Sequence, residues 1–297
     1  MNYYNEIKQE LLNNEINRKV KNYSINKSDL STYYNVGKLL LEAGNTYGES
    51  IIENYANKLM NEVGKKYDRS TLFKIRKFYA VFSNEKVAPL VPQLSWSHCL
   101  ILLPIEDINK INYYIHQIEI NHYTKRQLQY AIKNHEYERL DENTKNKLIV
   151  KDASTVVDFV KNPILIRNIH KYNEISEKIL QKLILEDISS FMKELGNNFS
   201  FIDSEYKIYV DGRYNYIDLL LFNIEFNSYV VVELKVTELK KEHIGQIQVY
   251  MNYIDNNLRK ISQDKTIGII ICKKENKYVI DYCSDDRIIA REYELVL

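Results

Sequence analysis

YNYIDLLLFNIEFNSYVVVELKV, residues 214–236, places two apolar runs on either side of a short polar turn. Each run has the length and the content of β-branched and aromatic residues that are typical of a strand, so the stretch predicts a β-hairpin. Both runs also contain charged residues: Asp218 lies in the first, and Glu233 and Lys235 lie in the second. Charges inside strands that are otherwise suited to burial indicate a candidate functional site.

The alternation of side chains along a strand assigns these charges to one face of the hairpin. Glu233 and Lys235 are two residues apart and therefore share a face, and Asp218 can lie on the same side. On this pattern Ile217 and Leu219 belong to the opposite face, which is expected to be purely apolar. The hairpin is therefore predicted to have one apolar face and one face that carries the charges.

A turn centred between Glu225 and Phe226 would put Asp218 directly across from Glu233, with their Cβ atoms about 5 Å apart. Two carboxylates at that distance repel each other, and a divalent cation between them reverses the sign of the interaction. Mg²⁺ is suited to one or two carboxylates plus a substrate phosphate. Lys235 would point into the same pocket, where it could orient a water or offset charge on a phosphate. The ordinary alternative is an exposed Glu–Lys pair on a sheet, with Asp218 facing solvent.

The segment after the hairpin, about 238–257, predicts a helix that could add polar groups to this pocket. Gln246 and Tyr250 are four residues apart and hence on one helical face, and His243 precedes Gln246 by three. An amide and a phenol directed toward the strand ends could contact water or phosphate. Tyr250 as a partly buried core residue and Gln246 as a surface residue are the ordinary alternatives.

The whole chain has 297 residues, enough for two domains, and a net charge of +1. It has no apolar run long enough to span a membrane and no apolar leader at its start, so we expect a cytoplasmic protein without membrane contact. Three widely spaced cysteines indicate neither a disulfide framework nor a zinc site. A neutral protein can still bind nucleic acid through clustered basic residues.

The periodicity of apolar residues changes near residues 140–175. Before this point it is helical, and the expected helices lie at 30–44, 49–67, 70–83, 95–105, 106–120 and 124–135. Ser70 and Thr124 are the expected N-caps of two of them. We therefore expect an all-helical N-terminal domain over 1–140, of helix-turn-helix or winged-helix type, followed by a connector with local helix over 141–175.

Residues 176–297 show a mixed pattern. One long helix is expected to end at Gly196, a position suited to a left-handed C-cap. The expected strands lie at 199–210, 214–222, 228–236 and 266–272, with edge strands at 278–283 and 287–297. The order predicts a mixed β-sheet flanked by helices, of the α+β or α/β class.

The segment GKKYDRSTLFKIRKFY, residues 64–79, is strongly basic. It contains one acid, Asp68, and interleaved aromatic residues. Its basic residues are Lys65, Lys66, Arg69, Lys74, Arg76 and Lys77. A capped helix with a basic face after a short turn is typical of a helix that binds DNA phosphates. A solvated helix face is the alternative.

Several separated segments resemble one known group, the YhcG-like branch of the PD-(D/E)xK nucleases. They are RSTLFKIRKFYAVF, LSWSHCLILL, FMKELGNNFSFID, YIDLLLFN, YVVVELKV, IGQIQVYMNYID and TIGIIICK, in this order along the chain. The resemblance runs from about residue 30 onward and implies a restriction-endonuclease-like fold behind a helical domain. Ile217 stands where the motif name has proline.

The resemblance implies metal-dependent hydrolysis of phosphodiester bonds. Asp218, Glu233 and the Leu234 carbonyl would hold Mg²⁺, for which Mn²⁺ could substitute, and Lys235 and Gln246 would complete the catalytic set. The family also often places an acid on the helix before the sheet. Glu186 and Glu177 are the candidates here, and the aligned position is occupied by Gln181.

The leading hypothesis is a Mg²⁺-dependent nuclease that cuts DNA, with the N-terminal domain binding DNA or forming a homodimer. The second is a catalytically silent DNA-binding or assembly module that retains the nuclease fold. A third is a nuclease directed at RNA, because carboxylate–metal chemistry does not select the sugar.

Overall fold

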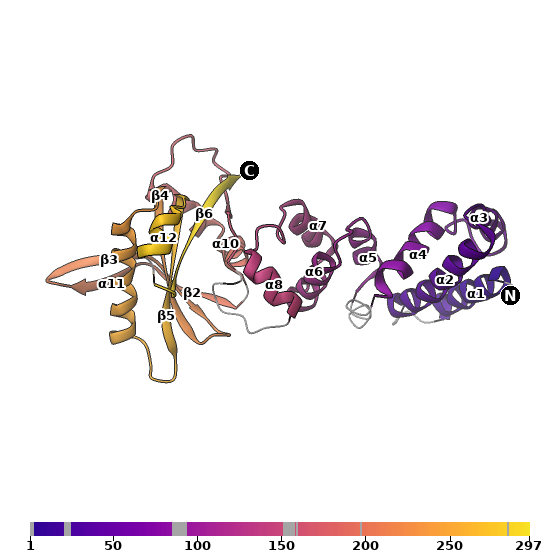
Figure 1. The fold of residues 1–297 in the computed structure, drawn as a ribbon, viewed down its shortest axis with the longest axis horizontal. Coiled ribbons are helices and arrows are strands. Elements are labelled where there is room, and N and C mark those ends of the chain that lie inside the picture. The colour runs from indigo at the N-terminus through magenta and orange to yellow at the C-terminus, as the bar shows by residue number, and fades with distance from the viewer. Residues whose placement is uncertain are drawn as a thin grey trace. The chain divides into compact units, whose positions relative to one another are not determined.

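The computed structural model describes residues 3–20, 25–84, 94–150, 158, 160–196, 198–283 and 285–297. The chain divides into two compact units, Met1–Tyr137 and Glu138–Leu297. Figure 1 shows helices throughout the first unit and a β-sheet with helices in the second. No helix among the described residues is both long and apolar enough to cross a membrane.

The regular secondary structure in the described part of the first unit consists of helices, with no strand. Its helices are α1 (Tyr3–Val20), α2 (Ile25–Tyr47), α3 (Ser50–Glu62), α4 (Arg69–Phe82), α5 (Trp96–Leu102), α6 (Ile108–Asn121) and α7 (Lys125–Lys133). The six helices expected from the sequence are confirmed, and α1 was not predicted. Pro89 and Pro92, which punctuate the sequence between α4 and α5, lie outside the described residues.

Two local features explain how α4 is placed. Its N-cap is Asp68, whose carboxylate accepts a hydrogen bond from the Thr71 amide, so the expectation that Ser70 caps this helix was wrong. An aspartate accepts this bond as well as a serine does, and with Asp68 as the N-cap the helix begins two residues earlier than expected. Gly37 of α2 lies against α4, where a Cβ atom would come within 2.5 Å of the Ile75 carbonyl oxygen. Only glycine permits this close approach of the two helices.

The second unit contains one six-stranded mixed sheet with strand order β1-β6-β5-β4-β3-β2. Strands β2, β3 and β4 are antiparallel neighbours, whereas the pairs β4–β5, β5–β6 and β6–β1 are parallel. The strands are β1 (Ile164–Arg167), β2 (Phe199–Val210), β3 (Arg213–Asn223), β4 (Ser228–Glu238), β5 (Asp264–Lys274) and β6 (Ile288–Val296). The helices are α8 (Glu142–Val150), α9 (Glu177–Glu186), α10 (Ile188–Leu195), α11 (Lys241–Asn257) and α12 (Lys277–Cys283).

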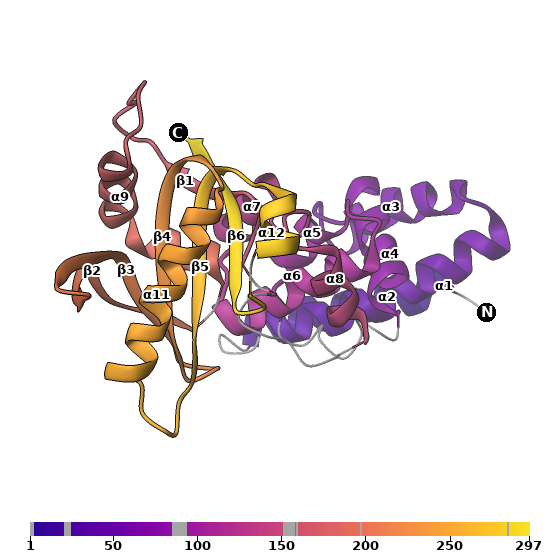
Figure 2. The same ribbon diagram turned by 60° about the vertical axis from the view of Figure 1, so that its left-hand side comes forward.

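The central strands of this sheet, β4 and β5, are buried on both faces along most of their length. Leu219 and Val232 belong to a core that includes residues of α9 and α10, whereas Leu220 and Val231 belong to a second core with α11 and α12. Figure 2 shows α11 crossing the face of the sheet opposite to α9. The predicted apolar face of the hairpin is confirmed for Leu219, Leu221, Val230, Val232 and Leu234, which all belong to the first core. The placement of Ile217 on that face was wrong, because Ile217 packs with Leu220 in the second core.

Three segments differ from the sequence predictions. The helix expected over 176–196 is divided into α9 and α10 at Asp187, which leaves helical geometry and caps α10 through the Ser190 amide. Residues 278–283 form helix α12 instead of a strand, because the side chain of Asn276 accepts from the Val279 amide and starts the helix. Residues 164–167, assigned from the sequence to the connector, form the edge strand β1.

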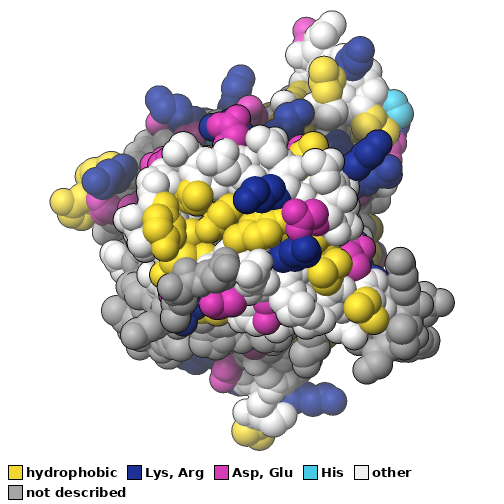
Figure 3. Space-filling view, turned by 90° about the vertical axis from the view of Figure 1, so that its right-hand side faces the viewer, with side chains coloured by type: hydrophobic (Ala, Val, Ile, Leu, Met, Phe, Trp, Pro, Cys, Tyr) yellow, Lys and Arg dark blue, Asp and Glu magenta, His cyan; other side chains and the backbone are white. Residues whose placement is uncertain are grey.

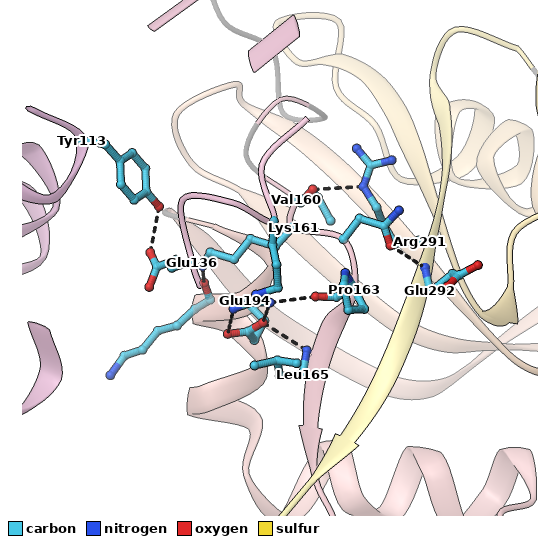
Figure 4. A network of polar contacts seen from close by, with 12 residues as sticks. Tyr113, Glu136, Val160, Lys161, Pro163, Leu165, Glu194, Arg291 and Glu292 are labelled. Atoms are coloured by element: carbon cyan, nitrogen blue, oxygen red, sulfur yellow. Dashed lines mark hydrogen bonds and ion pairs between the residues drawn. The ribbon is translucent and has the colours of Figure 1, made fainter. Parts of the chain in front are cut away.

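A polar network ties the edge strand to its neighbours. Glu194 of α10 accepts hydrogen bonds from the Leu165 amide and from the guanidinium of Arg139 (Figure 4). Arg291 of β6 donates to the Val160 carbonyl at 3.0 Å. Leu165 and Val160 both lie in the expected connector, and these bonds join it to α10 and β6. The described residues of the connector therefore belong to the second unit.

Candidate active site

The acidic pair of the hairpin lies where β3 and β4 separate. The β3–β4 ladder runs from Asn223↔Ser228 to Leu219↔Val232, which is the register expected from a turn centred between residues 225 and 226. One position further, this register brings Asp218 opposite Glu233. Beyond that point β3 continues only along β2, and β4 only along β5. We call this position the β3/β4 fork.

The charged side chains converge at the fork through short contacts. Asp218 Oδ2 accepts a hydrogen bond from the Leu234 amide at 2.7 Å, and Lys235 Nζ lies 3.2 Å from Glu233 Oε2. Glu233 is only 1% exposed and Lys235 only 8%, whereas Asp218 is half-buried. The three groups therefore form one cluster that reaches solvent through Asp218.

Burial and proximity shift the pKa values of all three groups. Burial, together with the negative charge of Asp218, raises the pKa of Glu233 to about 8. Burial also raises the pKa of Asp218, although its bond to the Leu234 amide opposes the shift. For Lys235, burial alone would lower the pKa, but the nearby carboxylates, Glu233 first, outweigh it and raise the pKa. With both carboxylates ionised, the cluster would contain more negative charge than Lys235 neutralises, and the raised pKa of Glu233 expresses this excess.

The donor set fits a small divalent cation. Oε1 of Glu233 is buried and has no hydrogen-bond partner among the described residues, which is costly unless a cation or proton occupies it. Within the described part of the chain, no group of three or more His, Cys, Asp or Glu side chains could hold a metal ion. Asp218 and Glu233 would therefore supply two carboxylates, a number that suits Mg²⁺ because it retains water and phosphate ligands.

Helix α9 contributes two residues to this cluster. Gln181 is buried and donates from Nε2 to the Asp218 carbonyl oxygen at 3.0 Å. Glu177, one helical turn earlier, reaches to 3.9 Å from Lys235 Nζ. Ser176 caps the helix and so places Glu177 in its first turn, beside the fork. Of the two acids considered from the sequence, Glu177 is the one brought to the site.

Glu186 is not brought to the fork. It lies at the last residue of α9, nine positions after Glu177, where its carboxylate is 2.9 Å from His170 Nε2 and 3.8 Å from Lys182 Nζ. These contacts are at the surface of the unit. The sequence could not separate the two acids because both lie within the expected helix.

Helix α11 places a polar pair near the same cluster. Gln246 donates to the Tyr250 hydroxyl at 3.0 Å. Burial raises the pKa of Tyr250, and the charges of Glu233, Lys235 and Asp218 act on it as well. The Tyr250 phenol is therefore within electrostatic range of the fork charges, and Gln246 is hydrogen-bonded to it.

Four of the six basic residues predicted to bind DNA, Arg69, Lys74, Arg76 and Lys77, line a groove on α4. The groove has a volume of about 630 Å³, and its lining includes Phe73 between the guanidinium groups of Arg69 and Arg76. Arg69 and Arg76 are paired with Glu53 and Glu49. Figure 3, which faces this unit, shows Lys/Arg and Asp/Glu side chains interspersed around hydrophobic ones.

Three of the six predicted cations form no ion pair within the described residues. Lys74 and Lys77 also line the groove, are exposed and form no ion pair within the described residues. Lys65 is exposed as well, whereas Lys66 pairs with Glu15. The positive charge most available to a ligand in the groove is therefore that of Lys74 and Lys77.

Two comparisons of the sequence agree with this arrangement. Residues 6–139 match the DUF1016 N-terminal domain, and residues 157–297 match the YhcG PDDEXK nuclease domain. A curated protein of Escherichia coli (strain K12), named "Putative nuclease YhcG", is 21% identical over 319 residues, which cover 92% of this chain and 85% of that protein.

Solved structures give a weaker likeness. A repair endonuclease from Pyrococcus abyssi has 17% identity over 42% of this chain and 49% of its own, with a TM-score of 0.28. The structure of an EndoMS–dsDNA2 complex has 17% identity over 42% of this chain and 48% of its own, with a TM-score of 0.29. The chain thus spans about half the length of each. The two domain matches alone, which lie in order over residues 6–139 and 157–297, show that the chain has the domain composition of the YhcG-like proteins, a DUF1016 N-terminal domain followed by a YhcG PDDEXK nuclease domain.

Proposed function

We propose that this protein is a Mg²⁺-dependent nuclease that hydrolyses phosphodiester bonds of DNA at the β3/β4 fork. The observation that carries the proposal is the convergence of Asp218, Glu233 and Lys235 at one partly open position, with a buried carboxylate oxygen of Glu233 that has no partner among the described residues. An ordinary surface salt pair would not require burial of Glu233. A nuclease domain match over the same residues supports the assignment.

Each residue at the fork has a proposed role. Asp218, Glu233 and the Leu234 carbonyl would hold the cation, which supplies Lewis-acid polarisation of the phosphate and activation of water when bound. Lys235 has a raised pKa and so keeps its proton at neutral pH. It therefore acts as a positive charge that orients the substrate phosphate, not as a base. Gln181 holds the backbone of Asp218 in place from α9.

Glu177 and Gln246 complete the proposed site. Glu177 is 48% exposed at its side chain and lies on the solvent side of Lys235, where it can accept a hydrogen bond from a water. Gln246 orients the Tyr250 hydroxyl at the other helix. Both would act on bound water or phosphate rather than on the cation directly.

The first unit is proposed to bind DNA through the groove on α4. Lys74 and Lys77 would contact phosphates, and Lys65, Lys66, Arg69 and Arg76 would add to the local positive charge. A homodimer is also proposed, because enzymes that cut both strands of a duplex often use two active sites.

A cleavage assay tests the proposal. Single-stranded, duplex and branched DNA, and RNA of the same sequence, are incubated with Mg²⁺, with Mn²⁺ and with EDTA. We expect cleavage of DNA that EDTA abolishes, and loss of cleavage in Asp218→Asn and Lys235→Met with little change in thermal unfolding. Glu225→Gln, which removes an acid at the turn of the same hairpin, is the matched control and should cleave like the unchanged protein. Cleavage retained in both fork variants would show that the site lies elsewhere.

A catalytically silent module is the second candidate. The observation that favours it is Gln181, an amide where the family often has an acid. Such a protein would bind DNA with a salt-dependent affinity, would cleave no substrate with any divalent cation, and would tolerate Lys235→Met.

A further inference from the structure

The β2–β3 hairpin continues beyond the β3/β4 fork and carries an exposed aromatic face. Tyr209, Tyr214 and Tyr216 are 56%, 61% and 53% exposed, and Lys207 beside them is also exposed. Exposed tyrosines are common singly, but three on adjacent positions of two strands form a continuous surface. This cluster, together with Lys207, is called the tyrosine face below.

The register of the two strands holds the tyrosine face together. Tyr209 pairs with Tyr214, and Lys207 pairs with Tyr216. The rings of Tyr209 and Tyr214 have centroids 5.0 Å apart at 57°, and Lys207 Nζ lies 3.7 Å from the centroid of the Tyr214 ring. Residue Ile208 alternates to the opposite side and is buried, so the hairpin is anchored on one side while its rings point outward.

The tyrosine face begins next to the proposed catalytic acid. Tyr216 is two residues before Asp218 on the same strand, and Tyr214 is four residues before it. At about 3.4 Å per residue, their Cα atoms are about 7 Å and about 14 Å from that of Asp218 along the strand. A nucleic-acid strand whose phosphate lies at the fork would therefore have its neighbouring nucleotides within reach of these rings.

We propose that the tyrosine face binds unpaired nucleotides adjacent to the scissile phosphate, so that the preferred substrate contains single-stranded nucleic acid beside the cut. The inference rests on the proposed function, because the fork defines where the strand is held. Aromatic rings stack on bases of any sequence, and a nearby cation contacts the backbone. In a duplex the base faces are covered by their neighbours in the stack, so only an unpaired segment can use the rings. Lys207 would supply the cation, and Arg213, exposed at the hairpin tip, could supply a second.

A second copy of this chain is the competing occupant of the tyrosine face. A stable protein–protein interface requires about 20 to 30 residues on each side. The tyrosine face has four, and the adjoining hairpin tip carries Asp211, Gly212 and Arg213, all exposed. The small area, the cation and the position beside Asp218 favour a nucleic-acid strand.

The test measures binding separately from cleavage. The full chain is titrated with a fluorescent single-stranded oligonucleotide and with the matching duplex, in EDTA so that nothing is cut. Tyr214→Ala and Tyr216→Ala together are expected to weaken binding of the single strand by at least about fivefold, the lower end of the range for loss of one stacked base. Binding of the duplex should change by less than twofold. Tyr214→Phe with Tyr216→Phe keeps the rings and should restore single-strand binding.

A control on the same unit uses Tyr282→Ala. Tyr282 is 76% exposed on α12 and pairs with another ring, but it is not on the hairpin, so its loss should leave binding unchanged. Single-strand affinity that is unaffected by the paired alanine variant would overturn the proposal. The proposal would also be overturned if light scattering gave the paired alanine variant a different molecular mass from the unchanged protein, because the tyrosines would then form a contact between copies. If the unchanged protein binds single strands through the tyrosines but cuts nothing with Mg²⁺, hydrolysis is refuted while the stacking surface stands.

Discussion

Protons should compete with Mg²⁺ for Glu233. In the metal-free protein, burial and the charge of Asp218 raise the pKa of Glu233 to about 8. The carboxyl is therefore mostly protonated at pH 7, and the cation can bind only after the proton has left. The apparent affinity for Mg²⁺ should rise with pH up to about 8 and then become constant.

The size of the effect follows from the pKa. The concentration of Mg²⁺ that gives half-maximal binding scales as one plus the ratio of protonated to ionised Glu233. For a pKa of about 8, that factor is about 100 at pH 6, about 11 at pH 7 and close to one at pH 9. The Mg²⁺ midpoint should thus fall about tenfold from pH 6 to pH 7 and about tenfold again from pH 7 to pH 9.

Initial cleavage rates measured against Mg²⁺ concentration at several pH values, at constant ionic strength, give the midpoint separately from the maximal rate. The separation matters because hydroxide also changes the maximal rate. Calorimetric titration of the DNA-free protein with Mg²⁺ should show the same dependence and release of about one proton at pH 7. A Mg²⁺ midpoint that does not change between pH 6 and pH 8 would refute the assignment of Glu233 as a buried ligand.

Three further predictions concern other parts of the molecule. Glu177→Gln should lower the maximal cleavage rate at least tenfold, because Glu177 reaches the fork. Glu186→Gln, at the far end of the same helix, should cleave normally. Equal rates in the two variants would contradict this placement of the acids. Lys74→Gln with Lys77→Gln should weaken DNA binding at every sequence and reduce the slope of log affinity against log salt by about two, measured by fluorescence anisotropy. Arg139→Met leaves the buried Glu194 carboxylate without its cation, so the free energy of unfolding measured in urea should fall by about 3 kcal/mol. A fall of less than about 1 kcal/mol would show that the ion pair is dispensable.

Metal-free stability should also depend on pH through Glu233. Its pKa is about 8 in the folded chain and near 4.5 when unfolded, so the folded state binds the proton more tightly. The stabilisation is complete below pH 4.5 and is lost as the pH rises to about 8. Thermal unfolding in EDTA should therefore show a lower midpoint at pH 8.5 than at pH 6, and Glu233→Gln should reduce this difference.

The hairpin could be predicted in detail because its signals are local. The apolar runs flank a short turn, and a turn centre at residues 225 and 226 sets the register for the whole pair. That register placed Asp218 one position beyond the last pair, opposite Glu233. The prediction was wrong for Ile217, because the strand changes the face it presents where β3 leaves β4, and simple alternation does not include such a twist.

Elements that depend on distant partners could not be predicted. The break at Asp187 lies within a continuous helical pattern, and its cause is a capping bond to the Ser190 amide. Strand β1 has only four residues, and its identity as a strand depends on pairing with β6. Helix α12 has the β-branched and aromatic content of a strand, but its cap at Asn276 overrides that preference.

Assignment of the helical acid shows the same limit. Glu177, Gln181 and Glu186 all lie within one expected helix, and the sequence gives no distance from any of them to the strands. Only the Ser176 cap, which sets where α9 begins, and the approach of α9 to the sheet decide that Glu177 and Gln181 face the fork. A capping residue just before an acid is the signal that could have identified Glu177.

The parallel pairing of β1 with β6 has a consequence for synthesis of the protein. Ile164 pairs with Tyr293, so β1 can pair only after a segment about 130 residues later has been synthesised. The hairpin that brings Asp218 opposite Glu233 instead closes over a turn of a few residues. We expect a nascent chain to bring its acidic ligands together well before the sheet around them is complete. Chains ending before Ile288 lack β6, which pairs with both β1 and β5, so they should be degraded rapidly although the hairpin can form; a stable fragment of that length would show that β6 is dispensable for the sheet.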